Sequence, residues 1–353
     1  MTPASLSTVP ATPVEEIPAG EQEAVAKMIA ELKKQLTERY IEKQEPVRRD
    51  AHPKLLGLVR ARFVVSDDCP MELRHGIFDG TYDTFEAEIR FSNGHPEMTH
   101  DLVFDVRGMA IKLPAVNGAF FPECGQDFLL ATAEAFFGSN AVDYVGFPAA
   151  STSIGKTLRY FIGGRRFRGG WQLIKSLRIP PSPLALEYYS QTPYRLGPHC
   201  VKYQARPLAA RHRTHDPWYM LPVLRQAFGW AAHFAPKAVA PLVPGDALRS
   251  ALVRDLAIGP VTYEFLVQRW PDLSRLPTWA IEDATRTWPA PWVRVATIEI
   301  GQQCRIPERA AQAERMTFSP WHALAAHQPL GSINRARLAV YRTMSEFRNS
   351  KNP

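Results

Sequence analysis

Near its end the chain reads Asn334-Arg335-Ala336-Arg337-Leu338-Ala339-Val340-Tyr341 and continues without Gly or Pro to Asn349. The spacing of its apolar residues predicts an α-helix over 334–349. On that helix Arg337 and Tyr341 are four residues apart, so the guanidinium lies beside the phenol. Arg348 follows Tyr341 by seven residues, two turns further along the same face. The helix therefore presents a phenol between two arginines.

This pair of Arg337 and Tyr341 has two interpretations. The pKa of a phenol is about 10, so ionising one at neutral pH costs roughly 4 kcal/mol without help. A neighbouring arginine supplies part of that free energy, and a ferric ion supplies more. The helix carries either a tyrosinate ligand of haem iron, with Arg348 available to a haem propionate, or a half-buried tyrosine on a surface helix. The rest of the chain has to decide between them.

The composition is that of an ordinary globular protein. The chain has 353 residues, of which 45% are hydrophobic and 22% charged, and this length suffices for a large core. The net charge of +7 is too dispersed to indicate nucleic-acid binding. The densest basic cluster is Arg165-Arg166-Phe167-Arg168. Most such clusters are solvated loops, and a minority contact anionic lipid or an acidic substrate.

The cysteines and the first residues bear on the compartment. The four cysteines stand far apart and form no CxxC pair: Cys69, Cys124, Cys200 and Cys304. They indicate neither a zinc site nor a disulfide framework, which favours a reducing compartment. The first 20 residues lack the apolar segment of a secretory signal, and no apolar run is long enough to span a bilayer. We expect a disordered tail over 1–20, one domain over 21–353 and a cytoplasmic location.

Periodicity gives the elements. Alternation of apolar and polar residues predicts strands over 55–65, 84–92, 261–270 and 292–300, and a turn followed by a short strand within 105–113. Residues 126–130 form a further apolar run, and 185–205 contains two extended runs around Pro193. Helical spacing predicts helices over 21–40, 158–177 with a glycine break, 247–256 and 334–349. Arg90 lies inside an apolar strand pattern, where a buried arginine needs an anionic partner. With no repeat and no linker, the pattern predicts one α+β domain with a substantial antiparallel sheet.

Separated pieces of the sequence then line up in one order: Arg49-x-x-His52, Arg90-Phe91-Ser92, Asp105-x-Arg107-Gly108-x-Ala110-x-Lys112, Phe136-Phe137 and Arg337-x-x-x-Tyr341 followed by Arg348. This ordered set resembles the haem catalases over about residues 46–349. The chain is too short for the arm and C-terminal extension of full-length catalases, and it looks like the short catalase-related branch that handles hydroperoxides, including lipid ones. The resemblance implies a catalase-like antiparallel β-barrel core with surrounding α-helices, and haem b (iron protoporphyrin IX) buried between barrel and C-terminal helix.

The resemblance also implies a role for each site residue. Tyr341 would be the proximal iron ligand, kept ionised by Arg337. His52 would be the distal acid–base group, and its ordinary pKa of about 6.5 puts it in the base form at neutral pH. Phe136 would form a wall of the haem pocket. Three arginines would hold the two propionates by charge-assisted hydrogen bonds: Arg49, Arg90 and Arg348.

One departure from the catalase pattern lies just before the Phe136-Phe137 pair. Catalases carry an asparagine there that helps to orient hydrogen peroxide, whereas this chain reads Leu130-Ala131-Thr132-Ala133-Glu134-Ala135. Thr132 has one hydrogen to donate, while an amide has two donors and an acceptor. We therefore expect weak dismutation of hydrogen peroxide. Small distal residues would leave room for a bulkier organic hydroperoxide: Ala51, Ala131 and Ala133.

Three functions stay open on the sequence alone. The first is a haem-dependent peroxidase or isomerase acting on organic or fatty-acid hydroperoxides. The second is a small monofunctional catalase that dismutates hydrogen peroxide. The third is a non-enzymatic haem-binding protein, or a catalase-like fold that has lost its haem. The expected partner is a small-molecule hydroperoxide, with no nucleic acid and no transmembrane segment, and a homo-oligomer stays open.

Overall fold

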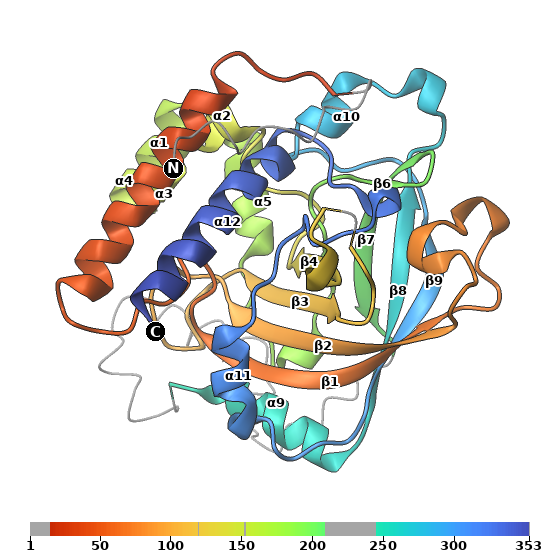
Figure 1. Cartoon of the computed structure of the whole chain (residues 1–353). Coiled ribbons are helices and arrows are strands. Elements are labelled where there is room, and N and C mark those ends of the chain that lie inside the picture. Colours follow the sequence, from red (N-terminus) through yellow and green to blue (C-terminus); the bar gives the residue numbers. More distant parts are fainter. Residues whose placement is uncertain (1–14, 119, 152, 209–244, 353) are drawn as a thin grey trace.

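A computed structural model of the chain describes residues 15–118, 120–151, 153–208 and 245–352. An antiparallel β-barrel forms its centre (Figure 1). The strands are β1 (Leu55–Val65), β2 (Thr84–Asn93), β3 (Arg107–Leu113), β4 (Gln126–Ala131), β5 (Tyr188–Tyr189), β6 (Tyr194–Leu196), β7 (His199–Pro207), β8 (Val261–Arg269) and β9 (Trp292–Ile300). The order β5-β4-β3-β2-β1-β9-β8-β7 is closed by pairing of β5 with β7, and β6 extends β7 as a hairpin. The predicted antiparallel barrel is confirmed.

Aromatic side chains fill the interior of the barrel. Phe63 on β1, Phe128 on β4 and Phe265 on β8 are fully or almost fully buried, as is Tyr203 on β7. The ring of Phe265 lies 5.0 Å from that of Phe63 and 4.9 Å from that of Phe128, centroid to centroid. The first five residues of β1 are all buried, and from Val59 to Val65 buried side chains alternate with more exposed ones, as the pleat of a strand requires. The barrel is thus a packed core that supports a site on its outside.

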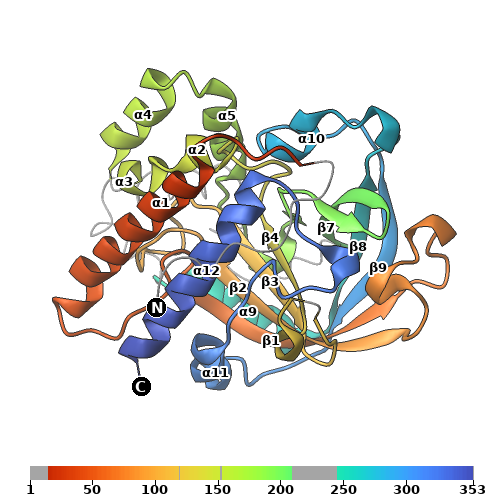
Figure 2. The ribbon, with the colours of Figure 1, turned by 45° about the horizontal axis from the view of Figure 1, so that its top comes forward.

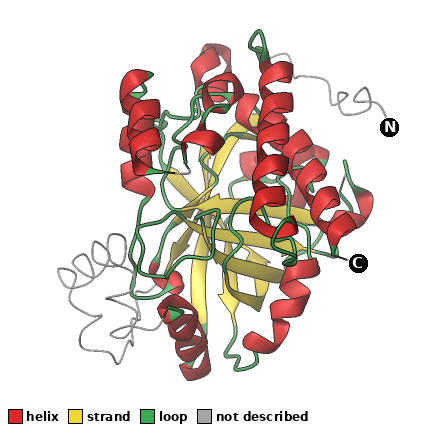
Figure 3. Ribbon diagram, turned by 90° about the vertical axis from the view of Figure 1, so that its left-hand side faces the viewer, coloured by secondary structure: helices red, strands yellow, loops and turns green. Residues whose placement is uncertain are grey.

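Helices surround the barrel (Figures 1 and 3). They are α1 (Glu21–Leu36), α2 (Ala141–Tyr144), α3 (Phe147–Ala150), α4 (Ile154–Gly163), α5 (Phe167–Ser176), α9 (Ala247–Ile258), α10 (Thr278–Glu282), α11 (Ala310–Arg315) and α12 (Ser332–Lys351). The C-terminal helix α12 runs beside α1, and a separate apolar cluster joins the two through Met28, Leu36, Val340 and Met344. None of the helices in the described ranges is both long and apolar enough to cross a lipid bilayer.

Two predicted helices can be compared with the observed ones. The helix expected over 21–40 is α-helical only to Leu36, and one wider turn, Thr37–Ile41, completes it. The glycine break expected within 158–177 is confirmed, because α4 ends and α5 follows after the Gly163-Gly164 pair, although α4 begins four residues earlier than expected. Glycine carries a large conformational entropy cost in a helix, so a glycine pair is a natural place for a break.

The start of α12 is fixed by one arginine, Arg335. Its guanidinium lies 2.6 Å from the carboxylate of Glu15, 2.8 Å from that of Glu21 and 2.9 Å from that of Glu282. We call this group the Arg335 clamp. It ties α12 to α1, to α10 and to residues just before α1. Of the predicted tail 1–20, residues 1–14 lie outside the described residues, and Glu15 belongs to the clamp.

Candidate active site

The proximal side of the candidate site is built on α12. Arg337 Nη2 donates a hydrogen bond to Tyr341 Oη over 3.1 Å, and its guanidinium carbon lies 5.0 Å from the centroid of that ring. Arg337 Nη1 donates to Asn334 Oδ1 over 3.2 Å. The contact expected from the four-residue spacing is present. Burial tends to lower the pKa of Arg337, but the neighbouring phenols of Tyr341 and Tyr194 outweigh it and raise that pKa.

Asn334 holds Arg337 in place. Its side chain is fully buried, and Asn334 Nδ2 donates to the carbonyls of Pro193 and Leu330 over 2.9 and 3.0 Å. The backbone carbonyl of Asn334 accepts a hydrogen bond from Trp321 Nε1 over 2.7 Å. Because the amide nitrogen is used in this way, its oxygen is turned toward the guanidinium. The arginine that contacts the phenol is therefore preorganised by the fold.

The distal candidate, His52, precedes β1 and is held against β2 and β3. Its Nδ1 lies 3.1 Å from Ser92 Oγ, and its carbonyl accepts a hydrogen bond from Arg90 Nη2 over 2.8 Å. A Cβ on Gly108 would lie 2.7 Å from the imidazole ring, closer than packing allows. The glycine of the sequence motif, Gly108, is thus required for steric reasons, since only a residue without a Cβ lets β3 approach this ring. His52 itself has φ of +56°, a left-handed conformation.

The electrostatics of His52 favour a neutral ring. Burial lowers its pKa to about 3, helped by the positive charges of Arg90, Arg337 and Arg107 and opposed by a hydrogen bond with the backbone of Asn93. The imidazole is therefore a base throughout the neutral range.

Three arginines predicted to bind propionates come together: Arg49, Arg90 and Arg348. We call them the arginine cluster. Burial, together with the charges of Arg90 and Arg348, lowers the pKa of Arg49 to about 9. Burial likewise lowers the pKa of Arg90 to about 10, with Glu314 opposing the shift and Arg348 adding to it. Mutual repulsion of this kind calls for negative charge nearby.

Some hydrogen-bond donors of the arginine cluster have acceptors within the chain, and others have none among the described residues. Arg49 donates to Glu314 Oε2 over 3.0 Å and to the carbonyls of Ala313 and Met316 over 2.9 and 2.6 Å. Within the described part of the chain, Arg90 Nε and Arg348 Nη2 are buried and have no hydrogen-bond partner. A buried guanidinium donor left unpaired is costly, so these two atoms fit an anionic ligand. Arg49 is anchored mainly by the end of α11.

Phe136 belongs to an aromatic group near the proximal tyrosine. Its ring centroid lies 4.4 Å from that of Phe137 and 5.2 Å from that of Tyr144. Tyr144 also packs against the apolar cluster that contains Val340 and Met344 of α12, the helix that carries Tyr341. Phe136 is thus within one aromatic contact of the residues around Tyr341. Its role as a pocket wall stays a prediction.

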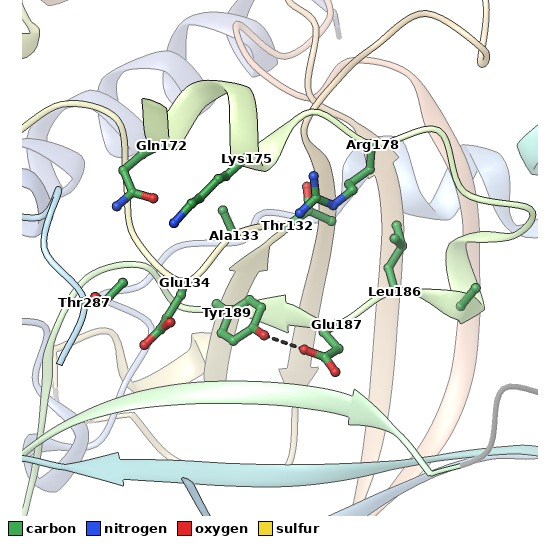
Figure 4. Close-up of a pocket in the computed structure, with 11 residues that line it drawn as sticks. Thr132, Ala133, Glu134, Gln172, Lys175, Arg178, Leu186, Glu187, Tyr189 and Thr287 are labelled. Carbon is green, nitrogen blue, oxygen red and sulfur yellow. Dashed lines mark hydrogen bonds between the residues drawn. The ribbon is translucent and has the colours of Figure 1, made fainter. Parts of the chain in front are cut away.

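Thr132 is used within the chain. Its side chain is buried, its hydroxyl donates to the carbonyl of Ser176 over 2.7 Å, and it accepts from the amide of Arg107 over 3.0 Å. The hydroxyl proton of Thr132, which the sequence suggested as a donor to peroxide, is therefore used in a hydrogen bond within the chain. Thr132 instead contributes to a cavity of about 400 Å³ between α5 and the strands, where the Tyr189 hydroxyl donates to Glu187 (Figure 4).

The sequence assigned no role to several residues of the site. Ser92 and Asn334 stood in the quoted motifs, yet their contacts with His52 and Arg337 were not anticipated. Glu314 comes from α11, more than 200 residues from Arg49 and Arg90. Only the position of Ser92 beside Arg90 in the strand motif gave a signal that could have identified it.

The chain was also compared with known proteins. No protein-family model matches it, and no curated protein sequence does. Among solved structures, a fungal catalase is similar with a TM-score of 0.67 and 18% identity, over 88% of this chain and 61% of that one. Catalase A from Saccharomyces cerevisiae is similar with a TM-score of 0.64 and 16% identity, over 90% of this chain and 64% of that one. The chain has a catalase-like fold, shorter than these catalases.

Proposed function

We propose that this chain is a haem-dependent enzyme acting on hydroperoxides, with Tyr341 as the iron ligand and His52 as the distal acid–base group. The observation that carries the proposal is the state of the arginine cluster. In the described residues, Arg90 Nε and Arg348 Nη2 are buried donors without a partner. They lie in the same region as a neutral imidazole and an arginine-bound phenol. The catalase-like fold supports the same conclusion.

These side chains fit haem b. Two carboxylates are what the unused donors of Arg90 and Arg348 require, and such charge-assisted hydrogen bonds are the strong ones. Arg337 donates to Tyr341 Oη, which favours the ionised phenol and offsets part of the roughly 4 kcal/mol needed to ionise it. When bound, haem supplies a ferric centre at which the O–O bond of a peroxide is cleaved.

His52 moves the proton in this reaction. Its pKa of about 3 keeps the ring neutral, so it accepts the hydroperoxide proton at neutral pH. The hydroxyl of Ser92 engages Nδ1, which leaves Nε2 for the substrate. The ring then returns the proton to the departing oxygen, which leaves as an alcohol or as water. Ser92 and Gly108 fix the imidazole so that both transfers use one geometry.

The substrate class follows from the segment before the Phe136-Phe137 pair, which carries an asparagine in catalases. The hydroxyl of Thr132 is committed to Ser176, so the position that carries an asparagine in catalases has no donor to spare here. Dismutation needs a second hydrogen peroxide molecule to be held and oxidised, and this step suffers most without that donor. The short side chains Ala131 and Ala133 flank Thr132. We therefore propose organic hydroperoxides as substrates, ahead of hydrogen peroxide.

Stopped-flow mixing of the haem-loaded protein with a fatty-acid hydroperoxide and with hydrogen peroxide tests the proposal. We expect the organic hydroperoxide to be consumed faster and little oxygen to be released. His52→Ala should retain haem and lose roughly 10²–10⁴-fold in rate, whereas His75→Ala, outside the site, should retain the rate. Rapid oxygen release from hydrogen peroxide would instead establish a small catalase. A normal haem spectrum without any peroxide reactivity would establish a haem-binding protein.

A further inference from the structure

Helices α4 and α5 lie next to each other at one edge of the molecule, with α4 on the outside (Figure 2). Five large apolar side chains on them are between 54% and 66% exposed: Leu158, Ile162, Phe167, Trp171 and Ile174. We call them the α4–α5 ridge. On α4 two of them are four residues apart, and on α5 the other three follow at four and three residues, so each helix carries one continuous apolar stripe.

An ordinary surface helix buries its apolar side, whereas α5 buries small and polar residues. The residues it buries are Gly169, Gln172 and Ser176. Gln172 Nε2 donates to the carbonyl of Thr285 over 3.0 Å, and a Cβ on Gly169 would lie 2.2 Å from the carbonyl of Phe137. The small and polar side is therefore the one that fits the protein. The apolar side faces outward, and large apolar side chains exposed along one face of a helix point to an interaction site.

The same segment accounts for the net positive charge of the chain. Residues 154–178 contain seven Lys and Arg and no Asp or Glu. Removing these seven from the 42 Lys and Arg residues leaves 35, equal to the number of Asp and Glu. Arg166 pairs with Asp143, and Arg168 lies 3.2 Å from Asp283. Six of the seven cationic side chains are exposed: Lys156, Arg159, Arg165, Arg168, Lys175 and Arg178. Of these, Lys175 and Arg178 also line the cavity of Figure 4.

We propose that the α4–α5 ridge is a docking surface for an anionic lipid membrane. An apolar stripe inserts at the boundary of headgroups and acyl chains, and flanking cations attract acidic lipids. Trp171 suits that boundary, and Lys175 Nζ lies 5.6 Å from its ring centroid, with an aliphatic stem long enough to reach headgroups. The inference is independent of haem and goes beyond the proposed function.

Charge favours a membrane over a second copy of the chain as the partner of the ridge. Most protein dimers are two-fold symmetric, so each copy contributes the same surface. Packing the ridge against itself would bring two sets of seven cations together, of which Arg166 and Arg168 pair with Asp143 and Asp283. Like charges facing each other in this way oppose association. An acidic lipid surface supplies the complementary charge, and its hydrocarbon accepts the apolar stripes.

Cosedimentation of the full chain with vesicles tests the proposal. Vesicles of phosphatidylcholine alone are compared with vesicles of equal parts phosphatidylcholine and phosphatidylglycerol. We expect binding to the mixed vesicles that weakens with salt, and much weaker binding to phosphatidylcholine. Arg165→Gln should weaken binding about fivefold. Trp171→Ser should weaken it about tenfold or more, because the buried apolar area is lost.

Matched controls are available on the other side of the barrel. Met71→Ser removes an apolar side chain that is 76% exposed, and Arg305→Gln removes an exposed cation, and neither should change vesicle binding. All four positions are exposed, so the melting temperature should stay near that of the wild type. Absence of binding to the mixed vesicles would overturn the proposal, as would equal binding by Trp171→Ser. A dimer in light scattering that Trp171→Ser dissolves, without vesicle binding, would assign the ridge to a second copy.

Discussion

Two sets of arginines on and around α12 differ in whether their hydrogen-bond donors have acceptors within the chain. In the Arg335 clamp, one guanidinium meets three carboxylates at 2.6 to 2.9 Å. In the arginine cluster, three guanidinium groups share the nearby carboxylates of Glu314 and Asp50. Within the described residues, Arg90 Nε and Arg348 Nη2 remain buried without a partner.

We interpret this difference as that between a structural site and a binding site. Where each donor has an acceptor within the chain, the arginine stabilises the fold and needs nothing more. Where buried cations repel each other and keep unused donors, the chain bears a cost that Glu314 and Asp50 offset in part and that an anionic ligand would offset further. The pKa directions agree, because burial and repulsion lower the pKa of Arg49 and Arg90, whereas hydrogen bonds to Glu21 and Glu282 outweigh burial and raise that of Arg335.

The largest effect is expected for Arg335→Met. Removing one partner from a buried ionic group leaves the three carboxylates of the clamp uncompensated, so the free energy of unfolding of the haem-free protein should fall by about 3–5 kcal/mol. Arg342 on the same helix makes only an exposed pair with Glu346, and Arg342→Met should cost well under 1 kcal/mol. Urea unfolding measures both. Equal losses for the two variants would remove the distinction between the clamp and a surface pair.

Arg348→Met should behave in the opposite way. It removes a buried cation with an unused donor, so the stability of the haem-free protein should be unchanged or slightly higher. Haem affinity should fall about 10- to 100-fold, since a hydrogen bond to a charged group contributes about 1.5–3 kcal/mol. Haem titration followed by absorbance measures this, with Arg342→Met as the control. A destabilised haem-free variant with normal haem affinity would contradict the account.

The third effect concerns pH. The pKa of His52 is lowered to about 3 in the folded protein, whereas an unfolded histidine titrates near 6.5. Between these values the unfolded state binds the extra proton, so the free energy of unfolding falls as pH falls from about 6.5 to about 3. His52→Gln should remove this contribution. At pH 4 the haem-free wild type should have lost on the order of 2 kcal/mol more than the variant, relative to pH 7. Parallel stability curves would mean that His52 is solvated.

The smallest effect is expected for Glu314→Gln. The carboxylate lies 3.0 Å from Arg49, is about one-third exposed, and opposes the lowered pKa values of the arginine cluster. Its loss should cost the haem-free protein about 1 kcal/mol. Propionates near the same arginines would replace part of its charge, so the cost should be smaller in the haem-loaded protein. Urea unfolding of both forms measures the difference, and equal costs would place the anionic ligand elsewhere.

Local patterns in the sequence were enough for much of the fold. The strands β1 and β9 have the predicted bounds, because alternation of side chains is a property of neighbouring residues. The contact of Arg337 with Tyr341 was equally local, one turn of helix apart. Closure of the barrel came from the family resemblance, since the pairing of β5 with β7 has no local signal.

The parts that could not be predicted depend on distant contacts. The clamp joins Arg335 to Glu15 and Glu21, more than 300 residues away, and no periodicity reports such a pair. The anchoring of Arg49 by residues 313–316 and the hydrogen bond of Thr132 to Ser176 are also tertiary. Residue types indicated the chemistry of the candidate site. The packing of the whole chain, however, determines which arginine hydrogen-bond donors have no acceptor.

The central claim is that Tyr341 binds haem iron. Its most direct test is the absorption spectrum of the haem-loaded protein, compared with Tyr341→Phe and with Tyr144→Phe, the neighbouring buried phenol. We predict that the wild type and Tyr144→Phe share the charge-transfer bands of a ferric phenolate, and that Tyr341→Phe lacks them. A Tyr341→Phe spectrum identical to that of the wild type would contradict the account.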